Sequence, residues 1–268
     1  MDLLSGDLLV ILFAVGLVAG FVDSIAGGGG LLTIPVLLWC GLTPAQAIAT
    51  NKLQSSFGSF SAALRFVRSG EVDPRAVAPV AACAAAGAVL GALALQVSDP
   101  EFLRDVIPLL LIGIAVYLLA FPTAGNLDQH RRIGDGTFAL TAGLGIGFYD
   151  GFFGPGTGTF LAIAFVTLQG FNLRKATAHT KLVNFASNIA SLLLFMAGGQ
   201  ILWAAGLVMG VAQFIGAQAG AHMVMRDGAR LVRPMLVFAS LAITAKLVWS
   251  DEGNWLRSVV LWAVSPLL

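Results

Sequence analysis

The chain has 268 residues, of which 57% are hydrophobic and 11% are charged, and its formal net charge at pH 7 is +1. Soluble globular proteins are roughly 45–50% apolar and about 25% charged, so this composition excludes an ordinary soluble domain. The small net charge and the lack of a basic tract argue against nucleic acid as a partner, and no motif predicts a metal or a cofactor.

Apolar segments separated by short polar connections predict an all-α polytopic membrane protein, because a spanning helix needs about 20 mostly apolar residues. In chain order the predicted segments are 7–25, 31–42, 44–68, 76–97, 102–121, 136–152, 156–171, 173–197, 200–224 and 229–249, followed by 255–268. Segments 31–42 and 156–171 are short for a crossing, so we expect a re-entrant or half-helix form at these two places and eight to ten crossings in all. With the N-terminus outside, ten loop Lys and Arg residues lie inside and two lie outside, which is the bias of cytoplasmic loops.

The first unusual element is GFVDSIAGGGG at 20–30, in which Asp23 precedes four consecutive glycines inside an apolar tract. A glycine run is a poor helix interior, so it predicts an unwound backbone at membrane depth, after which a new helix begins. The next long helix carries Lys52 about eight residues from its start, at a depth of roughly 12 Å. A polar stripe on that helix consists of Lys52, Ser55 and Ser59, with Asn51 and Gln54 beside it.

The same features recur in the second half of the chain. GFYDGFFG at 147–154 matches GFVDSIAG at 20–27, so that Asp150 aligns with Asp23 at an offset of 127 residues. After a two-residue insertion, Thr180-Lys181-Leu182 matches Asn51-Lys52-Leu53 at an offset of 129. The second glycine break is followed by a helix whose polar stripe consists of Thr177, Lys181, Asn184, Asn188 and Ser191.

These matches predict two repeats, at 1–125 and 134–250, followed by a short apolar segment at 251–268. Each repeat holds about five helical segments, an odd number, so the second repeat enters the membrane from the opposite side. Inverted-topology repeats with helices broken at glycine-rich motifs are typical of secondary transporters, whose site lies near the midplane between the repeats.

The charged groups and the breaks together predict a site for a small anion. A charge at mid-bilayer depth costs several kcal/mol unless it faces a partner or a hydrated cavity. A helix that restarts after a break presents free N–H donors and a positive dipole end. The predicted binding residues are Lys52, Lys181, Asn51, Thr180, Asn184, Gly28, Gly29, Gly156, Thr157 and Gly158. The residues predicted to hold the broken helices or the lysines, or to carry a coupling proton, are Asp23, Asp150 and His179.

Other interpretations remain open. Pairs within each repeat, Asp23 with Lys52 and Asp150 with Lys181, would make the charges structural, as in a membrane scaffold. An intramembrane aspartyl protease would use Asp23 and Asp150 as two carboxylates that share a proton. Against a protease, the glycines follow each Asp rather than precede it, and a Lys accompanies each. The spacings interpreted as tight helix packing are Gly16/Gly20, Gly87/Gly91 and Gly206/Gly210.

Four stretches resemble a known family: GFVDSIAGGGG (20–30), LTPAQAIATNKLQ (42–54), GFYDGFFGPGTGTF (147–160) and ATAHTKLVNFASNIASLLLF (176–195). They resemble the TauE/SafE sulfite exporter family and, within it, the YfcA-like subgroup, and the resemblance covers essentially the whole chain. It implies a bacterial inner-membrane (plasma-membrane) secondary transporter with a duplicated fold, whose members move sulfite, sulfoacetate or related small anions, usually outward.

Residues and resemblance together predict a multi-pass membrane transporter rather than an enzyme. The expected substrate is a small anion such as sulfite, an organosulfonate or a related carboxylate. We expect alternating access around a mid-membrane site, export as the direction, and protons as the coupling ions. The sequence does not indicate the substrate within this class or an oligomeric state.

Overall fold

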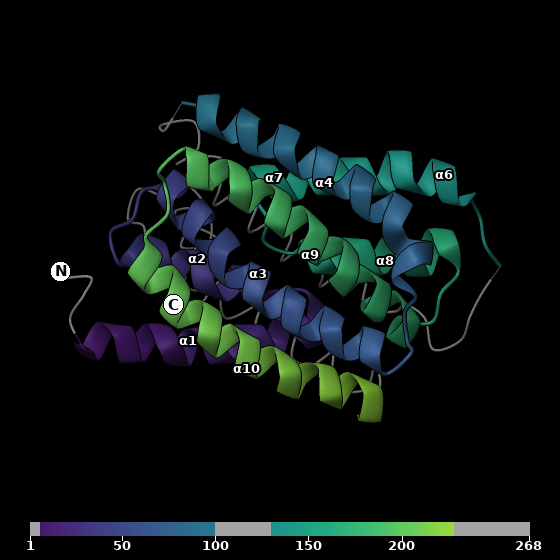
Figure 1. The fold of residues 1–268 in the computed structure, drawn as a ribbon, viewed down its shortest axis with the longest axis horizontal. Helices are drawn as coiled ribbons and strands as arrows, with labels where there is room; N and C mark the ends of the chain where they lie inside the picture. Colours follow the sequence, from purple (N-terminus) through teal and green to yellow (C-terminus); the bar gives the residue numbers. More distant parts are fainter. Residues whose placement is uncertain (1–5, 100–129, 228–268) are drawn as a thin grey trace, which may run out of the picture.

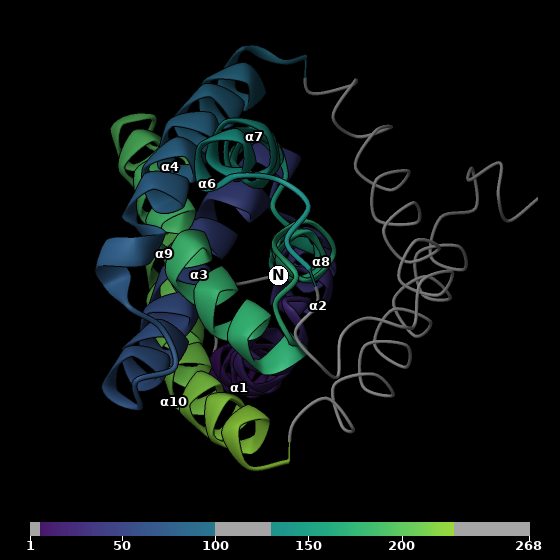
Figure 2. The same cartoon turned by 90° about the vertical axis from the view of Figure 1, so that its right-hand side faces the viewer.

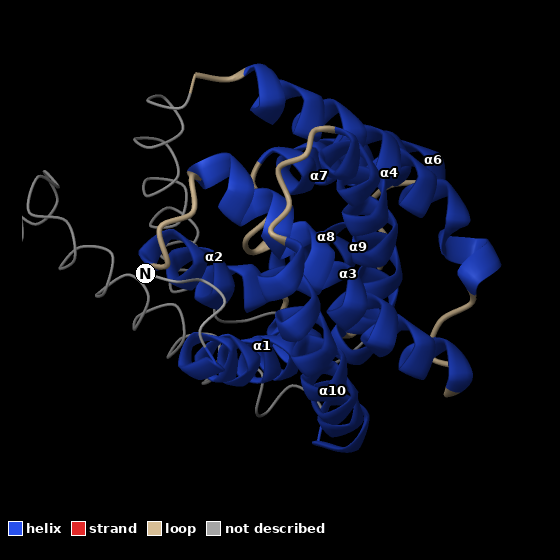
Figure 3. Ribbon diagram, turned by 60° about the vertical axis from the view of Figure 1, so that its left-hand side comes forward, coloured by secondary structure: helices blue, strands red, loops and turns tan. Residues whose placement is uncertain are grey.

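The computed structural model of the chain describes residues 6–99 and 130–227, and the elements of these ranges are helices (Figure 3). The helices are α1 (Gly6–Ala26), α2 (Gly29–Trp39), α3 (Pro44–Arg68), α4 (Pro74–Val97), α6 (Asp135–Phe138), the π-helical turn η1 (Ala139–Gly143), α7 (Leu144–Phe152), α8 (Thr157–Gln169), α9 (Leu173–Ala197) and α10 (Trp203–Asp227). They match the predicted segments within a few residues, and the helix predicted at 136–152 contains the wider turn η1. The segments predicted at 102–121, 229–249 and 255–268 lie outside the described residues.

Local sequence explains where the long helices begin. Thr43 caps α3: its hydroxyl accepts a hydrogen bond from the backbone N–H of Gln46, and its own backbone N–H donates to the Gln46 side chain. A proline, Pro44, occupies the first helical position. Asn172, at the equivalent position 129 residues later, caps α9 by accepting from the backbone N–H of Lys175. Each cap follows a left-handed glycine, so the two halves begin their central helix in the same way.

Within the described ranges, four helices are long and apolar enough to cross a membrane: 6–25, 74–97, 173–197 and 203–226. The helices α2 and α8 have only 11 and 13 residues, as expected for half-helices. The protein is therefore an all-helical membrane protein.

The helices form a bundle around a central pair, α3 and α9, which lie side by side (Figure 1). On one side α10 packs against α1 and α3, and on the other α4 packs against α7 and α9 (Figure 2). The short helices α2 and α8 lie together against the same face of the central pair (Figure 2). The fourth helix of each half thus packs against the first helix of the other half. This exchange supports the predicted repeats, while their inverted topology stays a prediction.

Glycine allows the outer helices to approach closely. A Cβ atom on Gly91 of α4 would lie 2.0 Å from the carbonyl oxygen of Phe148, and one on Gly216 of α10 would lie 2.0 Å from that of Leu17. No side chain fits at such distances, so the backbones themselves are in contact. Gly16 and Gly20 likewise face the backbone of α10, and Gly87 faces that of α7. Gly206 and Gly210 differ, because they pack against the side chains of Leu53 and Phe57 of α3. The packing interpretation of these glycines is confirmed.

Candidate functional site

The chain leaves the helical conformation at both predicted glycine breaks. Helix α1 ends at Ala26, Gly27 has a left-handed φ of +76°, and α2 begins at Gly29. In the second half α7 ends at Phe152 and α8 begins at Thr157, after two left-handed glycines. Only glycine adopts these φ values at little cost, which is why the breaks are rich in it.

The two breaks touch each other. A Cβ atom on Gly27 would lie 2.3 Å from the carbonyl carbon of Gly158, and one on Gly30 would lie 3.2 Å from the Cα atom of Pro155. The N-terminal ends of α2 and α8 therefore meet at the contact between the two halves. The positive dipole ends of these two helices converge on one region, which favours an anion there.

Each of the two repeat-related lysines forms an ion pair with an aspartate of the other half. Lys52 Nζ lies 2.7 Å from Asp150 Oδ1, and Lys181 Nζ lies 2.9 Å from Asp23 Oδ2. Both lysine side chains are 1% exposed. The alternative pairs within each repeat, Asp23 with Lys52 and Asp150 with Lys181, are wrong. Because the two breaks adjoin, each long lysine side chain reaches the acid beside the break of the opposite half.

Asp23 fastens the first break through backbone groups. Its Oδ1 accepts a hydrogen bond from the backbone N–H of Gly29 at 3.2 Å, which satisfies one of the free donors of α2. Its carbonyl oxygen accepts from Gly27 N at 2.7 Å and also from the Lys181 ammonium. Thr33 then ties α2 to α3 by donating to Asn51 Oδ1 at 2.7 Å. Asp23 and Lys181 thus connect the end of α1 to the start of α2.

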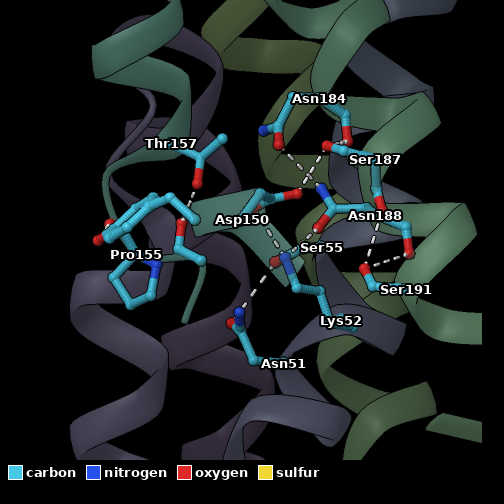
Figure 4. Close-up of polar contacts among 12 residues, drawn as sticks. Asn51, Lys52, Ser55, Asp150, Pro155, Thr157, Asn184, Ser187, Asn188 and Ser191 are labelled. Atoms are coloured by element: carbon cyan, nitrogen blue, oxygen red, sulfur yellow. Dashed lines mark hydrogen bonds and ion pairs between the residues drawn. The ribbon is translucent and has the colours of Figure 1, made fainter. Parts of the chain in front are cut away.

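Asp150 and Lys52 are surrounded by side chains of α9 (Figure 4). Ser187 donates to Asp150 Oδ2 at 2.6 Å, and Lys52 donates to Asn188 Oδ1 at 3.2 Å. Asn188 in turn donates to Asn184 Oδ1 at 3.2 Å. Neither Ser187 nor Asn188 was among the predicted binding residues. Asn188 belongs to the predicted polar stripe, whereas Ser187 aligns with Gly58 of the first half and carried no signal in the repeat.

These groups enclose a cavity of about 10 Å³, room for about one water molecule. Its lining residues are Asp23, Gly27, Gly30, Asn51, Lys52, Ser55, Asp150, Gly154, Gly158, Asn184 and Asn188. We call it the central cavity. Six of the predicted residues line it, and they come from five helices: Asp23, Asn51, Lys52, Asp150, Gly158 and Asn184. The lining glycines come from both breaks. Lys52, Asp23 and Asp150 line it, and Lys181 pairs with Asp23 from outside the lining, so the formal charge of the two ion pairs is zero.

Several predicted residues lie outside the central cavity. The lining does not include Lys181, Thr180, Gly28, Gly29, Gly156 or Thr157. Thr157 donates to Gly154 O at 2.6 Å and so closes its own turn. The buried Thr180 hydroxyl has no hydrogen-bond partner within the part of the chain that the structure describes.

His179 lies in a different place from the central cavity. It sits beside the rings of Phe165 and Phe171 at centroid distances of 5.5 and 4.7 Å, with Nδ1 2.8 Å from Lys175 O. It lines a separate cavity of about 440 Å³ near the start of α9. The part of the chain that the structure describes contains no group of three or more His, Cys, Asp or Glu side chains that could hold a metal ion.

Comparison with known proteins gives a family match over most of the chain. The model of the family Sulfite exporter TauE/SafE matches residues 12–247. The probable membrane transporter protein YfcA of Escherichia coli (strain K12) is 50% identical over 252 residues, 94% of each chain. The probable membrane transporter protein ORF9 of a Sinorhizobium species is 48% identical over 254 residues, covering 95% of this chain and 97% of the relative. A probable membrane transporter protein of Haemophilus influenzae is 49% identical over 247 residues, covering 92% and 96%. No solved structure matches.

Proposed function

Because the chain belongs to the TauE/SafE family, a family of membrane transporters, we propose that it is a secondary transporter of a small anion. The proposed substrates are sulfite, an organosulfonate or a related carboxylate, and the proposed direction is export. The site is the central cavity between the two halves, with alternating access to its two sides and protons as coupling ions.

One observation carries the choice of an anion: two half-helix N-termini and two buried lysines converge between the halves. Helix N-termini attract anions through free N–H donors and the dipole. In secondary transporters such ends point at anionic groups of the substrate near the bilayer midplane. Lys52 and the amide side chains of Asn51 and Asn184 line the cavity and are proposed to bind the anion directly.

The size of the cavity supports alternating access. About 10 Å³ holds a water molecule but not sulfite or a carboxylate, so an anion needs the breaks to separate. The breaks touch each other across the two halves, through Gly27 and Gly158, beside the packing of α1 with α10 and of α4 with α7. Rocking one half against the other would therefore open the cavity to one side at a time, as in transporters built from repeats.

Both the family of the protein and the geometry of the two aspartates exclude the protease interpretation. The relatives are named membrane transporters, so the protein is not an enzyme. An aspartyl dyad needs two carboxylates that share one proton. Here Asp23 and Asp150 each face a lysine ammonium at hydrogen-bonding distance.

A flux assay tests the proposal. The purified chain is reconstituted into liposomes, and uptake of labelled sulfite, sulfoacetate and acetate-sized carboxylates is compared with empty liposomes. We expect uptake of at least one of these anions by the wild type and none by Lys52→Ala or Lys181→Ala. Arg174→Ala, which removes an exposed ion pair with Glu71, is the matched control and should retain uptake. Full uptake by both lysine variants would reject the site.

A further inference from the structure

We propose that the two central ion pairs have different roles, and that only Lys52–Asp150 opens during transport. In this inference, which rests on the proposed function, the anion takes the place of the Asp150 carboxylate beside the Lys52 ammonium. Asp150 turns away with a bound proton, while Lys181–Asp23 stays closed as part of the scaffold. The repeat makes the pairs equivalent in sequence, but their surroundings differ.

The Lys181–Asp23 pair is built into the backbone. Asp23 is bonded to Gly29 N through its carboxylate, and its own carbonyl oxygen accepts from Gly27 N and from Lys181. Turning the Asp23 carboxylate away from Lys181 would also remove the acceptor of the buried Gly29 N–H, and moving Lys181 away would remove a donor from the Asp23 carbonyl oxygen. A buried N–H without an acceptor is costly, so opening this pair also loosens the break itself.

The Lys52–Asp150 pair involves side chains alone. Among the described residues, the partners of the Asp150 carboxylate are Lys52 and the Ser187 hydroxyl. The partners of the Lys52 ammonium are Asp150 and the side-chain oxygen of Asn188. A change of side-chain torsion in Asp150 therefore breaks two contacts and leaves the main chain of α7 and α8 bonded as before.

The position of the carboxylate explains why the cavity is so small. Asp150 lines the cavity from α7, and the lining residues of α3 and α9 are Asn51, Lys52, Ser55, Asn184 and Asn188. A carboxylate is itself a small oxyanion, similar in size and hydrogen-bonding geometry to sulfite or to a sulfonate headgroup. In this structure Asp150 occupies the position that a substrate oxyanion would need.

Charge balance couples the exchange to one proton. The charged groups of the two pairs are Lys52 of α3 with Asp150 of α7 and Lys181 of α9 with Asp23 of α1, which sum to zero. A singly charged anion, such as hydrogen sulfite or a sulfonate, entering alone would leave a net negative charge in a nearly dry place. If a proton from solvent forms an O–H bond on Asp150 as this anion binds Lys52, the sum remains zero. The neighbouring Tyr149 hydroxyl donates its hydrogen to Pro155 O at 2.6 Å, so that hydrogen is engaged in another bond.

The experiment measures sulfite uptake and internal pH together, in proteoliposomes that contain a pH-sensitive dye. A proton carried by sulfite itself is the same for every variant. The difference between two variants in the number of protons per transported sulfite therefore reports the protons that the protein carries. We expect Asp150→Asn to carry sulfite with one proton fewer than the wild type. We expect Asp23→Asn to unfold at a lower temperature and to carry little sulfite, because its break is no longer fastened.

Equal proton-to-sulfite ratios in the wild type and Asp150→Asn would overturn the inference, as would a folded Asp150→Asn that carries no sulfite. If Asp150→Asn does not fold, Ser187→Ala provides the second test, because it keeps the ion pair but removes a bond that favours the charged carboxylate. Its uptake should then persist to higher pH than that of the wild type, and an unshifted pH profile would overturn the inference. A wild type that transports none of the anions tested would instead reject the proposed function.

Discussion

Lys52 and Asp150 form a buried ion pair across the two halves of the protein, with 2.7 Å between Nζ and Oδ1. Their side chains are 1% and 2% exposed. Lys181 and Asp23 form the reciprocal pair, so each half supplies one cation and one anion to the other. The two halves are therefore joined by charges at the same place where their helices break.

The first prediction concerns which acid compensates Lys52. Lys52→Met leaves the Asp150 carboxylate buried without its cation, and we expect the free energy of unfolding to fall by about 3–5 kcal/mol. Replacing the acid as well, in Lys52→Met/Asp150→Leu, should recover most of this loss, because no buried charge is left unpaired. Unfolding of the purified chain in detergent, followed by circular dichroism, measures both variants.

The matched control is Lys52→Met/Asp23→Leu, which removes the acid of the same repeat. It should be less stable than Lys52→Met alone, since Lys181 loses its partner too. Recovery with Asp23→Leu rather than Asp150→Leu would mean that the pairs form within each repeat.

The second prediction concerns the contact between the breaks. Gly27→Ala places a methyl group 2.3 Å from the carbonyl carbon of Gly158 at a φ of +76°, so the breaks must separate. We expect a loss of anion flux together with lower stability. Gly41→Ala is the control, because Gly41 has a φ of +91° and no atom within 4 Å of the added Cβ. It should cost only the backbone strain, about 1–2 kcal/mol, and retain flux. Equal loss of flux in both variants would argue that strain alone, and not the contact, is responsible.

Much of this architecture could be predicted from sequence because its signals are local or repeated. Apolar length gave the helices within a few residues, and the glycine runs gave both breaks. The duplicated Asp and Lys positions identified the charged centre, whose residues Asn51, Lys52 and Asn184 do line the cavity.

What the sequence could not supply was the partner of each charge. A self-comparison shows that Asp23 corresponds to Asp150, but it does not say whether a lysine pairs within its own repeat or across the interface. That choice depends on how the halves dock, which follows from close backbone contacts such as Gly91 with Phe148. Ser187 aligns with Gly58 in the first half, so the self-comparison gave no signal for it. His179 was expected near the charged centre, but it lines a different cavity.

The third prediction tests the close helix packing. Gly91→Ala would place a methyl group 2.0 Å from the carbonyl oxygen of Phe148, so α4 must move away from α7. We expect destabilisation of about 1–3 kcal/mol, as for other overpacked contacts. Gly145→Ala lies in α7 with no atom within 4 Å of the new methyl group, and it should stabilise the helix by about 0.5–1 kcal/mol. Thermal unfolding in detergent compares the two, and similar melting temperatures would contradict the packing.

The fourth prediction concerns Gln213, which is 1% exposed and whose amide oxygen and nitrogen have no hydrogen-bond partner among residues 6–99 and 130–227. Its side chain lies against Gly58 of α3, while Ala84 holds the equivalent position in the other half and makes the same backbone contact without a polar group. An unpaired buried amide costs about 1–3 kcal/mol, so Gln213→Met, which keeps the shape, should raise the melting temperature.

Gln218 on the same helix makes the matched comparison for this fourth prediction. It accepts a hydrogen bond from Arg65 at 3.1 Å and donates one to Ser61 O at 3.0 Å, so Gln218→Met should lower the melting temperature. Opposite shifts in the two variants are expected because the same chemical change removes a cost at one position and two bonds at the other. If Gln213→Met were as destabilising as Gln218→Met, the Gln213 amide would have to bind a partner in the membrane, and water entering from the central cavity would be the first to test.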